Sequence, residues 1–176
     1  MSWHGADRLI DPMERVIVIG CPGSGKSTFA RALQEKTGLP LYHLDLMYWK
    51  PDRTTVEKAV FRARLTELLT LDRWIIDGNY GSTMEQRMAA CDTVFFLDYE
   101  VGICLSGIRA RRGKPRPDMP WVEYGEDEEF LSFVRSYERE SRPQVLRLLA
   151  CCRDKDIFVF HGREEADAYL ASLPTA

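Results

Sequence analysis

A glycine-rich run near the start of the chain constrains the fold more than any other feature. It fits the pattern G-x-x-x-x-G-K-[ST] and spans residues 20–27. An apolar stretch, residues 16–19, precedes it, and a segment with helical spacing follows it to Thr37, where Gly38 is placed to end a helix. This order of strand, glycine loop and helix is typical of a loop that binds phosphate groups.

The residue types in this loop explain why it would bind a nucleotide. Glycines let the backbone curl so that successive N–H groups point at phosphate oxygens, and the positive end of the following helix adds to them. Lys26 brings a charge toward the β- and γ-phosphates, and the Ser27 hydroxyl is suited to bind Mg²⁺. We therefore expect ATP, with GTP left open, and Mg²⁺ as cofactors. The predicted nucleotide-binding residues are Gly20, Cys21, Pro22, Gly23, Ser24, Gly25, Lys26, Ser27 and Thr28.

Apolar runs of strand length recur along the chain, at residues 16–19, 41–44, 74–76, 93–97 and 157–160. Because these runs are continuous rather than alternating, they predict strands buried on both faces, as in a parallel sheet. Segments with helical spacing lie between them, which favours a doubly wound α/β fold. With 176 residues and 45% apolar composition, the chain suits one core, and we expect a single domain over residues 1–176.

Three aspartates stand directly after apolar runs, where parallel sheets place their ligand sites. Asp77, before Gly78, resembles the Walker B carboxylate that orients Mg²⁺, although Asp98 competes for this role. Asp45 follows His43 by two residues, so on a strand both would face the same side. We expect Asp45 to contact a phosphoryl acceptor and to act as its base. His43 is either a second substrate contact or a core histidine.

Residues 109–129 are crowded with charge, first basic and then acidic, which indicates a solvated loop or a mobile lid. On the helix that should precede them, Arg112 continues the apolar stripe and Arg109 borders it, so we expect both to reach the transferring phosphoryl group. Arg111 falls on the other side. Arg116 is a substrate-binding candidate by its place in the sequence, and residues 46–73 are of a size to cover an acceptor.

Charge and composition bear on the function classes. The net charge is -3, from 24 Lys+Arg and 27 Asp+Glu, so the chain has no overall basic field to hold nucleic acid. No window approaches the roughly 18 apolar residues of a membrane span, and charges interrupt residues 1–15 in a way unlike a signal peptide. We expect a cytoplasmic protein without membrane partners, and its five cysteines as reduced thiols. In the loop, Cys21 is either a small packing residue or a thiol whose pKa the oriented N–H groups lower.

Several segments together resemble a known family: GCPGSGKST, HLDLMYWKP, WIIDGNYGSTMEQR, FFLD, RRGKPRPDM and SRPQVL. They are similar to small bacterial P-loop proteins named as DNA topology modulation proteins, which in turn resemble adenylate kinases. The resemblance implies a P-loop NTPase α/β/α sandwich with a five-stranded parallel sheet in order 2-3-1-4-5. It also implies that Asp77 and Gly78 occupy the place of the adenylate kinase Asp-Gly, and that residues 109–116 lie where those kinases carry lid arginines.

Two departures from adenylate kinases narrow the expected function. Adenylate kinases hold the monophosphate acceptor with an aromatic residue, a proline and an arginine, and this chain has Asn79 and Tyr80 at that place. The difference argues against AMP as the acceptor. Asn79 remains a candidate for binding another substrate. The lid lacks a four-cysteine zinc set, so no lid metal is expected. We therefore predict an ATP-dependent phosphotransferase for an unidentified small-molecule acceptor. The alternatives are a regulatory protein that binds ATP and a simple NTPase, and the oligomeric state is left open.

Overall fold

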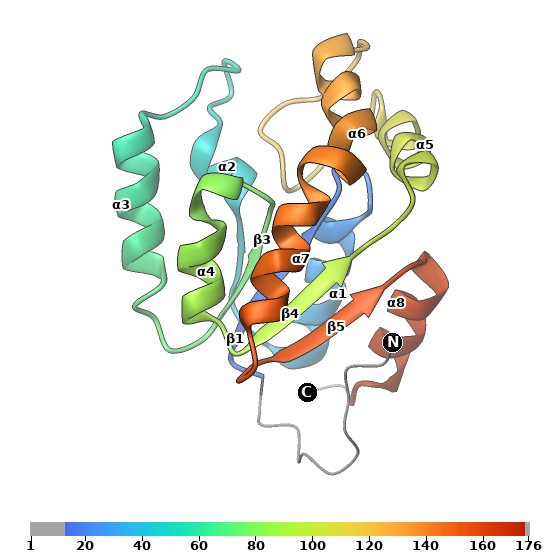
Figure 1. Cartoon of the computed structure of the whole chain (residues 1–176). Coiled ribbons are helices and arrows are strands. Elements are labelled where there is room, and N and C mark those ends of the chain that lie inside the picture. The colour runs from blue at the N-terminus through green and yellow to red at the C-terminus, as the bar shows by residue number, and fades with distance from the viewer. Residues whose placement is uncertain (1–12, 175–176) are drawn as a thin grey trace.

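The computed structural model describes residues 13–174 and places five strands in one parallel sheet (Figure 1). The strands are β1 (Arg15–Gly20), β2 (Leu41–His43), β3 (Trp74–Asp77), β4 (Thr93–Leu97) and β5 (Asp156–Phe160). Their order across the sheet is β2-β3-β1-β4-β5, and every neighbouring pair runs parallel. This arrangement confirms the doubly wound α/β fold and the strand order that the family resemblance implies.

The strands are apolar throughout because both faces of the sheet are covered. Along β1, Val16 and Val18 belong to one core layer, whereas Ile17 and Ile19 belong to the other, and none of the four is exposed. Burying a side chain of this kind stabilises the fold by roughly 1.5–3 kcal/mol relative to leaving it in water. Burial on both faces is therefore the physical reason for the continuous apolar runs in the sequence.

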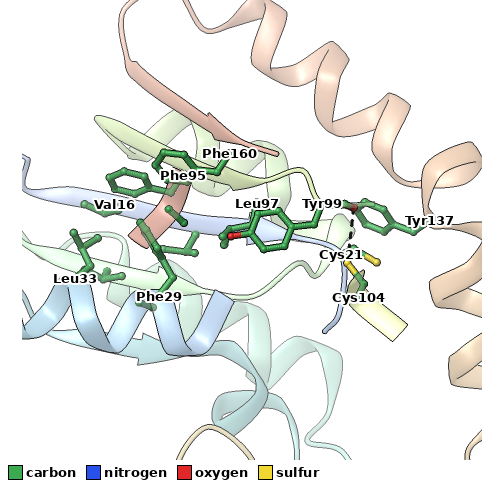
Figure 2. Packing of buried hydrophobic residues seen from close by; sticks show 14 of the residues in the cluster. Val16, Cys21, Phe29, Leu33, Phe95, Leu97, Tyr99, Cys104, Tyr137 and Phe160 are labelled. Carbon is green, nitrogen blue, oxygen red and sulfur yellow. Dashed lines mark hydrogen bonds between the residues drawn. The ribbon is translucent and has the colours of Figure 1, made fainter. Parts of the chain in front are cut away.

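Helices form the two outer layers (Figure 1). The helices α1 (Lys26–Thr37) and α8 (Arg163–Ser172) pack on one face, where Phe29 of α1 contacts the rings of Phe95 and Phe160 (Figure 2). On the other face lie α3 (Lys58–Leu68), α4 (Met84–Ala90) and α7 (Arg142–Cys151). The remaining helical elements are α2 (Leu44–Tyr48), the 3₁₀ turn η1 (Gly81–Thr83), α5 (Val101–Arg111) and α6 (Glu128–Glu140).

Two of these helices, α5 and α6, contribute to the same core layer as α1. Cys104 and Ile108 of α5 and Val134 of α6 are buried in it. The next helix, α7, begins at Arg142, and Pro143 lies in its first turn, where a missing N–H costs no hydrogen bond. The helix that the sequence predicts before Pro143 therefore stops there, at Glu140.

Two stretches outside the sheet contact each other. One is the covering segment, residues 46–73, and the other is the lid segment, residues 109–129. The rings of Trp49 and Trp121 meet edge to face with centroids 5.3 Å apart, and the Arg53 guanidinium lies 5.9 Å from the Trp121 ring centroid. Their proposed duties, covering an acceptor and closing over the nucleotide, stay predictions.

None of the helices within residues 13–174 has the length and apolarity needed to cross a membrane. The expectation that the chain starts without a signal peptide concerns residues 1–15, of which only residues 13–15 belong to the described part.

Candidate active site

The glycine-rich loop lies between β1 and α1, in the order that the sequence predicts. The Ser24 N–H donates to the Cys21 carbonyl at 3.1 Å, which closes a turn, and Lys26 opens the helix directly after Gly25. The Lys26 ammonium folds back and donates to the same Cys21 carbonyl at 3.1 Å. Burial lowers the pKa of Lys26. A phosphate oxygen would be a stronger partner for this ammonium than a neutral carbonyl, because the hydrogen bond would then join opposite charges.

Helix α5 packs directly on the backbone of this loop. A Cβ added to Gly107 would lie 2.1 Å from the Gly23 carbonyl oxygen, and a Cβ on Gly23 would lie 2.1 Å from the Cys104 carbonyl oxygen. So close an approach of two backbones leaves no room for a side chain at either glycine. The loop is therefore fixed against α5 as well as between β1 and α1.

The loop cysteine is a packing residue. Cys21 is completely buried beside Cys104 and Tyr137 (Figure 2). The neighbouring Cys104 side chain and burial raise the pKa of the Cys21 thiol. The alternative in which oriented N–H groups lower this pKa is therefore wrong, because the side chain points into the core and away from the concave side of the loop.

Asp77, the last residue of β3, meets the loop at Ser27. The Ser27 hydroxyl donates to Asp77 Oδ2 at 2.6 Å, and His43 Nδ1 lies 2.7 Å from the same oxygen. The other oxygen, Asp77 Oδ1, is buried and has no hydrogen-bond partner among the described residues. A buried carboxylate oxygen without a partner costs free energy unless a ligand reaches it.

These oxygens fit Mg²⁺ as nucleotide sites hold it. In such sites one or two protein oxygens bind the ion, and phosphate oxygens and water complete the shell. Ser27 Oγ and Asp77 Oδ1 are the two protein oxygens here that could take this place. Within residues 13–174 no three or more His, Cys, Asp or Glu side chains are grouped so that they could hold a metal ion. An ion at Asp77 would therefore depend on phosphate and water oxygens for the rest of its shell.

Asp98, the alternative to Asp77, is engaged elsewhere. Its two carboxylate oxygens accept from Nε and Nη2 of Arg142 at 2.7 and 2.8 Å, a two-point ion pair between the end of β4 and the start of α7. The guanidinium group of Arg142 therefore compensates the charge of Asp98, and the hydroxyl of Ser27 binds Asp77 instead. Of the two aspartates, Asp77 is therefore the one that the fold brings to the loop.

Asp45 lies opposite the loop, but on a helix. The sequence places His43 and Asp45 on one strand, and this is wrong, because β2 ends at His43 and α2 begins at Leu44. The Tyr80 hydroxyl donates to Asp45 Oδ1 at 2.7 Å, and Oδ2 receives no hydrogen bond from the described residues. Burial raises the pKa of Asp45, and the bond from Tyr80 opposes this rise. His43, in contrast, holds Asp77 and does not reach the cavity.

The turn after β3 is held by a buried arginine. Arg87 of α4 is completely buried and donates to the carbonyls of Gly78, Asn79 and Tyr80 and to the Thr83 hydroxyl. Burial lowers the pKa of Arg87 to about 10. The turn in return positions two side chains, since Asn79 Oδ1 accepts from the Gly20 N–H at 3.1 Å and Tyr80 reaches Asp45.

Arginines of the lid segment line the cavity, but Arg109 is not among them. Arg109 is exposed and lies outside the set of residues that line the cavity, whereas Arg111 lines it. Arg112 is at the cavity as well, and it donates to Glu126 at 2.7 Å. The expected position of Arg112 at the cavity is therefore met, but from outside the helix, because α5 ends at Arg111 and Arg112 has an extended backbone, with ψ 135°.

Acidic residues pair with these arginines. Arg116 lies 3.3 Å from Asp118 and 3.7 Å from Glu123, and Arg111 lies 3.1 Å from Glu123. Asp118 is buried and also contacts Arg31 of α1, at 3.4 Å. The lid segment is therefore tied to the nucleotide-binding helix.

One cavity of about 1340 Å³ joins most of these groups. Of the predicted nucleotide-binding residues, six line it and three, Gly20, Cys21 and Ser24, do not. The predicted substrate-binding residues Asp45, Asp77, Asn79 and Arg116 line it too. The walls also include residues that sequence reasoning did not single out for the site, namely Arg31, Trp49, Tyr80, Arg111, Asp118, Trp121 and Glu123. The one signal for Arg111 and Asp118 was their place within the quoted RRGKPRPDM stretch. Arg87, behind the cavity, is likewise the last residue of the quoted WIIDGNYGSTMEQR stretch, but no pattern indicated its role.

No protein-family model and no curated protein matches the sequence. Among solved structures, shikimate kinase from Bacteroides thetaiotaomicron is similar, with 19% identity, a TM-score of 0.57, and coverage of 90% of this chain and 95% of that chain. Shikimate kinase from Acinetobacter baumannii, solved in complex with shikimate, is 18% identical with a TM-score of 0.62, covering 92% of this chain and 90% of that one. The chain therefore has the fold of these shikimate kinases. The closer resemblance to DNA topology modulation proteins stays a prediction.

Proposed function

We propose that this chain is an ATP-dependent kinase for a small molecule. The observation that carries the proposal is a single cavity with a phosphate-binding loop on one side, where Ser27 pairs with Asp77, and a half-buried carboxylate, Asp45, on the other. A kinase needs both, because the γ-phosphoryl group passes between the nucleotide and the acceptor.

The loop and its helix would bind the triphosphate. Backbone N–H groups and Lys26 would hold the β- and γ-phosphates, and the Lys26 ammonium would exchange the Cys21 carbonyl for a phosphate oxygen. Ser27 and Asp77 would hold Mg²⁺, which neutralises phosphate charge when bound. His43 fixes the Asp77 carboxylate through Oδ2 and leaves Oδ1 for this duty.

Asp45 would serve the acceptor. Its raised pKa makes it a stronger base than an ordinary aspartate, and Tyr80 holds Oδ1 so that Oδ2 faces a hydroxyl. The acceptor oxygen forms a bond to the γ-phosphorus while the bond to the β–γ bridging oxygen breaks. ADP leaves with that electron pair, and Asp45 takes the hydroxyl proton. With a phosphate as acceptor, which is already ionised, Asp45 would orient the substrate only.

The guanidinium groups of Arg111, Arg112 and Arg116 would stabilise charge on the transferring group. Each presents parallel N–H donors, which match the equatorial oxygens that gain charge in the transition state. Arg111 replaces Arg109 in this proposal because Arg111 lines the cavity.

The test is an ATP-consumption screen with Mg²⁺ across nucleosides, nucleotides and small hydroxyl metabolites, on the unaltered chain and on Lys26→Ala. We expect one acceptor class to stimulate ATP turnover and Lys26→Ala to lower that turnover by at least about a hundredfold, since the change removes the charge that holds the phosphates. Lys36→Ala, near the far end of the same helix, is the matched control and should keep turnover within about twofold. ATP turnover that no acceptor stimulates would indicate a simple NTPase, and full turnover by Lys26→Ala would exclude the phosphate-loop assignment.

A further inference from the structure

Two arginines of the lid segment share one carboxylate oxygen. Arg111 Nε lies 3.1 Å and Arg116 Nη2 lies 3.7 Å from Glu123 Oε2. All three side chains line the cavity and are largely buried, with exposed fractions of 20%, 17% and 29%. A single internal anion thus occupies the position between two guanidinium groups beside the phosphate-binding loop.

The charges are paired, but the hydrogen bonds are not made. Arg111 Nε and Arg116 Nη2 are both buried and have no hydrogen-bond acceptor among the described residues. Their N–H groups are therefore not aimed at Glu123, although the nitrogens lie within ion-pair distance. Buried donors without acceptors are unfavourable, and a ligand with several oxygens could satisfy them where one carboxylate oxygen does not.

The position between these arginines lies close to both reacting sides of the cavity. Arg111 is near enough to Lys26 and Asp45 to affect the pKa of Lys26 and to have its own pKa affected by Asp45. Arg111, Arg116 and Glu123 also line the same cavity as Lys26 and Asp45, so a phosphoryl group held by the loop can share this space with them.

Of the two carboxylates beside these arginines, Glu123 is the one whose side chain can rotate away from them. Asp118 is buried and held by both Arg31 and Arg116, so it stays with the lid segment. The Glu123 backbone is anchored, since its carbonyl accepts from the Gly113 N–H at 2.8 Å. Rotation of the Glu123 side chain alone would therefore open the position.

We propose that the Glu123 carboxylate stands in for the γ-phosphoryl group between Arg111 and Arg116, and that ATP must displace it to bind. This inference rests on the proposed function, because it takes the triphosphate as the ligand of the cavity. Glu123 then lowers the ratio of ATP affinity to ADP affinity. It weakens the binding of ATP, whose γ-phosphoryl group needs this position, and leaves the binding of ADP nearly unchanged.

The test is Glu123→Gln, with ATP and ADP affinities measured by calorimetry in the presence of Mg²⁺. Removing the competing charge should tighten ATP binding about threefold to fivefold, the upper part of the range expected for a partly exposed ion pair, and change ADP binding by less than about 1.5-fold. Glu128→Gln is the matched control, because Glu128 lies in the same segment and pairs with Arg135 at 3.3 Å, and neither residue lines the cavity. It should leave the ratio of ATP to ADP affinity unchanged.

If Glu123→Gln also lowers stability, the same change is tested in a second variant, Arg111→Met. With Arg111→Met, the added change Glu123→Gln should no longer alter the affinity ratio, because the anion position has lost one of its two cations. An unchanged or lowered ratio in the single variant would overturn the inference while leaving the kinase proposal intact. Failure of the unaltered chain to bind either ATP or GTP would reject both, and a raised ratio without turnover on any acceptor would reject the kinase proposal alone.

Discussion

The two carboxylate oxygens of Asp77 are in different situations. Oδ2 accepts from Ser27 and His43, whereas Oδ1 is buried without a hydrogen-bond partner among residues 13–174. A carboxylate that served only to hold the strand end would have little reason to keep one oxygen unsatisfied, since the cost of such a group is about 1–3 kcal/mol. The arrangement is explained if an ion or its bound water reaches Oδ1.

We expect Asp77→Asn to impair the use of Mg²⁺ more than nucleotide binding. The amide keeps the size of the side chain but removes the charge that holds the ion, while the N–H groups of the loop remain. The Mg²⁺ concentration for half-maximal turnover should rise by about tenfold or more, with ATP affinity within about threefold. Turnover against Mg²⁺ and calorimetric ATP binding give the two quantities.

Asp98→Asn is the control for that variant. It breaks the pair with Arg142, at 2.7 Å, at the end of β4, but it should leave the Mg²⁺ profile unchanged. A shifted profile in Asp98→Asn together with a normal one in Asp77→Asn would move the assignment to Asp98.

The raised pKa of Asp45 predicts a pH dependence. The carboxylate is the active form of a base, so with a hydroxyl acceptor the rate should rise with pH through the raised pKa, and the acidic limb should lie above the ordinary aspartate value of 3.8. Tyr80→Phe should move this limb further up in pH, because the bond from Tyr80 lowers the pKa of Asp45. Asp45→Asn should lower acceptor-dependent turnover by more than about tenfold, with ATP affinity nearly unchanged.

The raised pKa of Asp45 also affects stability, which should fall as the pH rises, whereas the rate should increase. A carboxyl group whose pKa is higher in the folded chain binds its proton more tightly there, so its contribution to stability is present below about pH 3.8 and is lost as the pH rises through the folded pKa. At neutral pH we therefore expect Asp45→Asn to melt at a higher temperature than the unaltered chain. A lower melting temperature for this variant, or an acidic limb that Tyr80→Phe does not move, would contradict this account of Asp45.

At the scale of elements, the contact between α5 and the phosphate-binding loop is the most restrictive. The two backbones meet at Gly23 and Gly107. A Cβ added to either glycine would lie 2.1 Å from a backbone carbonyl oxygen on the other side of the contact. No side chain lies between them that could repack, so any added atom must displace the loop or the helix.

Gly107→Ala should therefore lower both stability and activity. Overpacking of this kind costs about 1–3 kcal/mol, and displacement of the loop should reduce turnover by roughly tenfold or more. Gly102→Ala, in the same helix, meets nothing within 4 Å and should raise the free energy of unfolding by about 0.5 kcal/mol. Denaturant unfolding and ATP turnover of the pair test the contact. Equal behaviour of the two variants would show that the helix is not tightly seated.

The ends of two elements explain where the sequence analysis of the site was wrong. The apolar run at residues 41–44 predicts a strand, yet a run this short does not separate strand from helix, and Leu44 opens α2 instead. Asp45 is consequently on a helix. In α5, the stripe predicts that Arg112 lies on the helix, but the helix ends one residue earlier. Arg112 lines the cavity from the extended backbone that follows, and Arg111, which the stripe places on the other side, lines it as well. Helix ends depend on tertiary packing and shift such assignments by one or two residues.

At the scale of the whole molecule, the sequence was a better guide. Strands buried on both faces leave continuous apolar runs, and the glycine loop places one strand and one helix by itself, so the α/β class follows from local patterns. The strand order came from the family resemblance and is confirmed. The pairs of the site, such as Arg31 with Asp118, join residues 87 positions apart, and no local pattern encodes which of many charges will meet.

The whole chain should respond to nucleotide as a unit. ATP with Mg²⁺ at about a hundredfold above its dissociation constant adds roughly 2.7 kcal/mol to the free energy of unfolding, which raises the melting temperature by roughly 5–10 °C for a chain of this size. Lys26→Ala should melt near the unaltered chain without nucleotide and show little of this rise. Differential scanning calorimetry measures both, and an equal rise in the variant would mean that ATP binds elsewhere.

The seating of α5 on the phosphate-binding loop gives the two arginines that share Glu123 different anchors. Arg111 is the last residue of α5, so the contact between Gly23 and Gly107 keeps it with the loop. Arg116 lies beyond Gly113, whose positive φ of 71° marks the bend that follows the helix. A rearrangement of residues 113–127 would therefore change the separation of the two arginines. A phosphoryl group that needs both guanidinium groups would find them together only in the arrangement that the pairs of Arg116 with Asp118 and Glu123 hold in place.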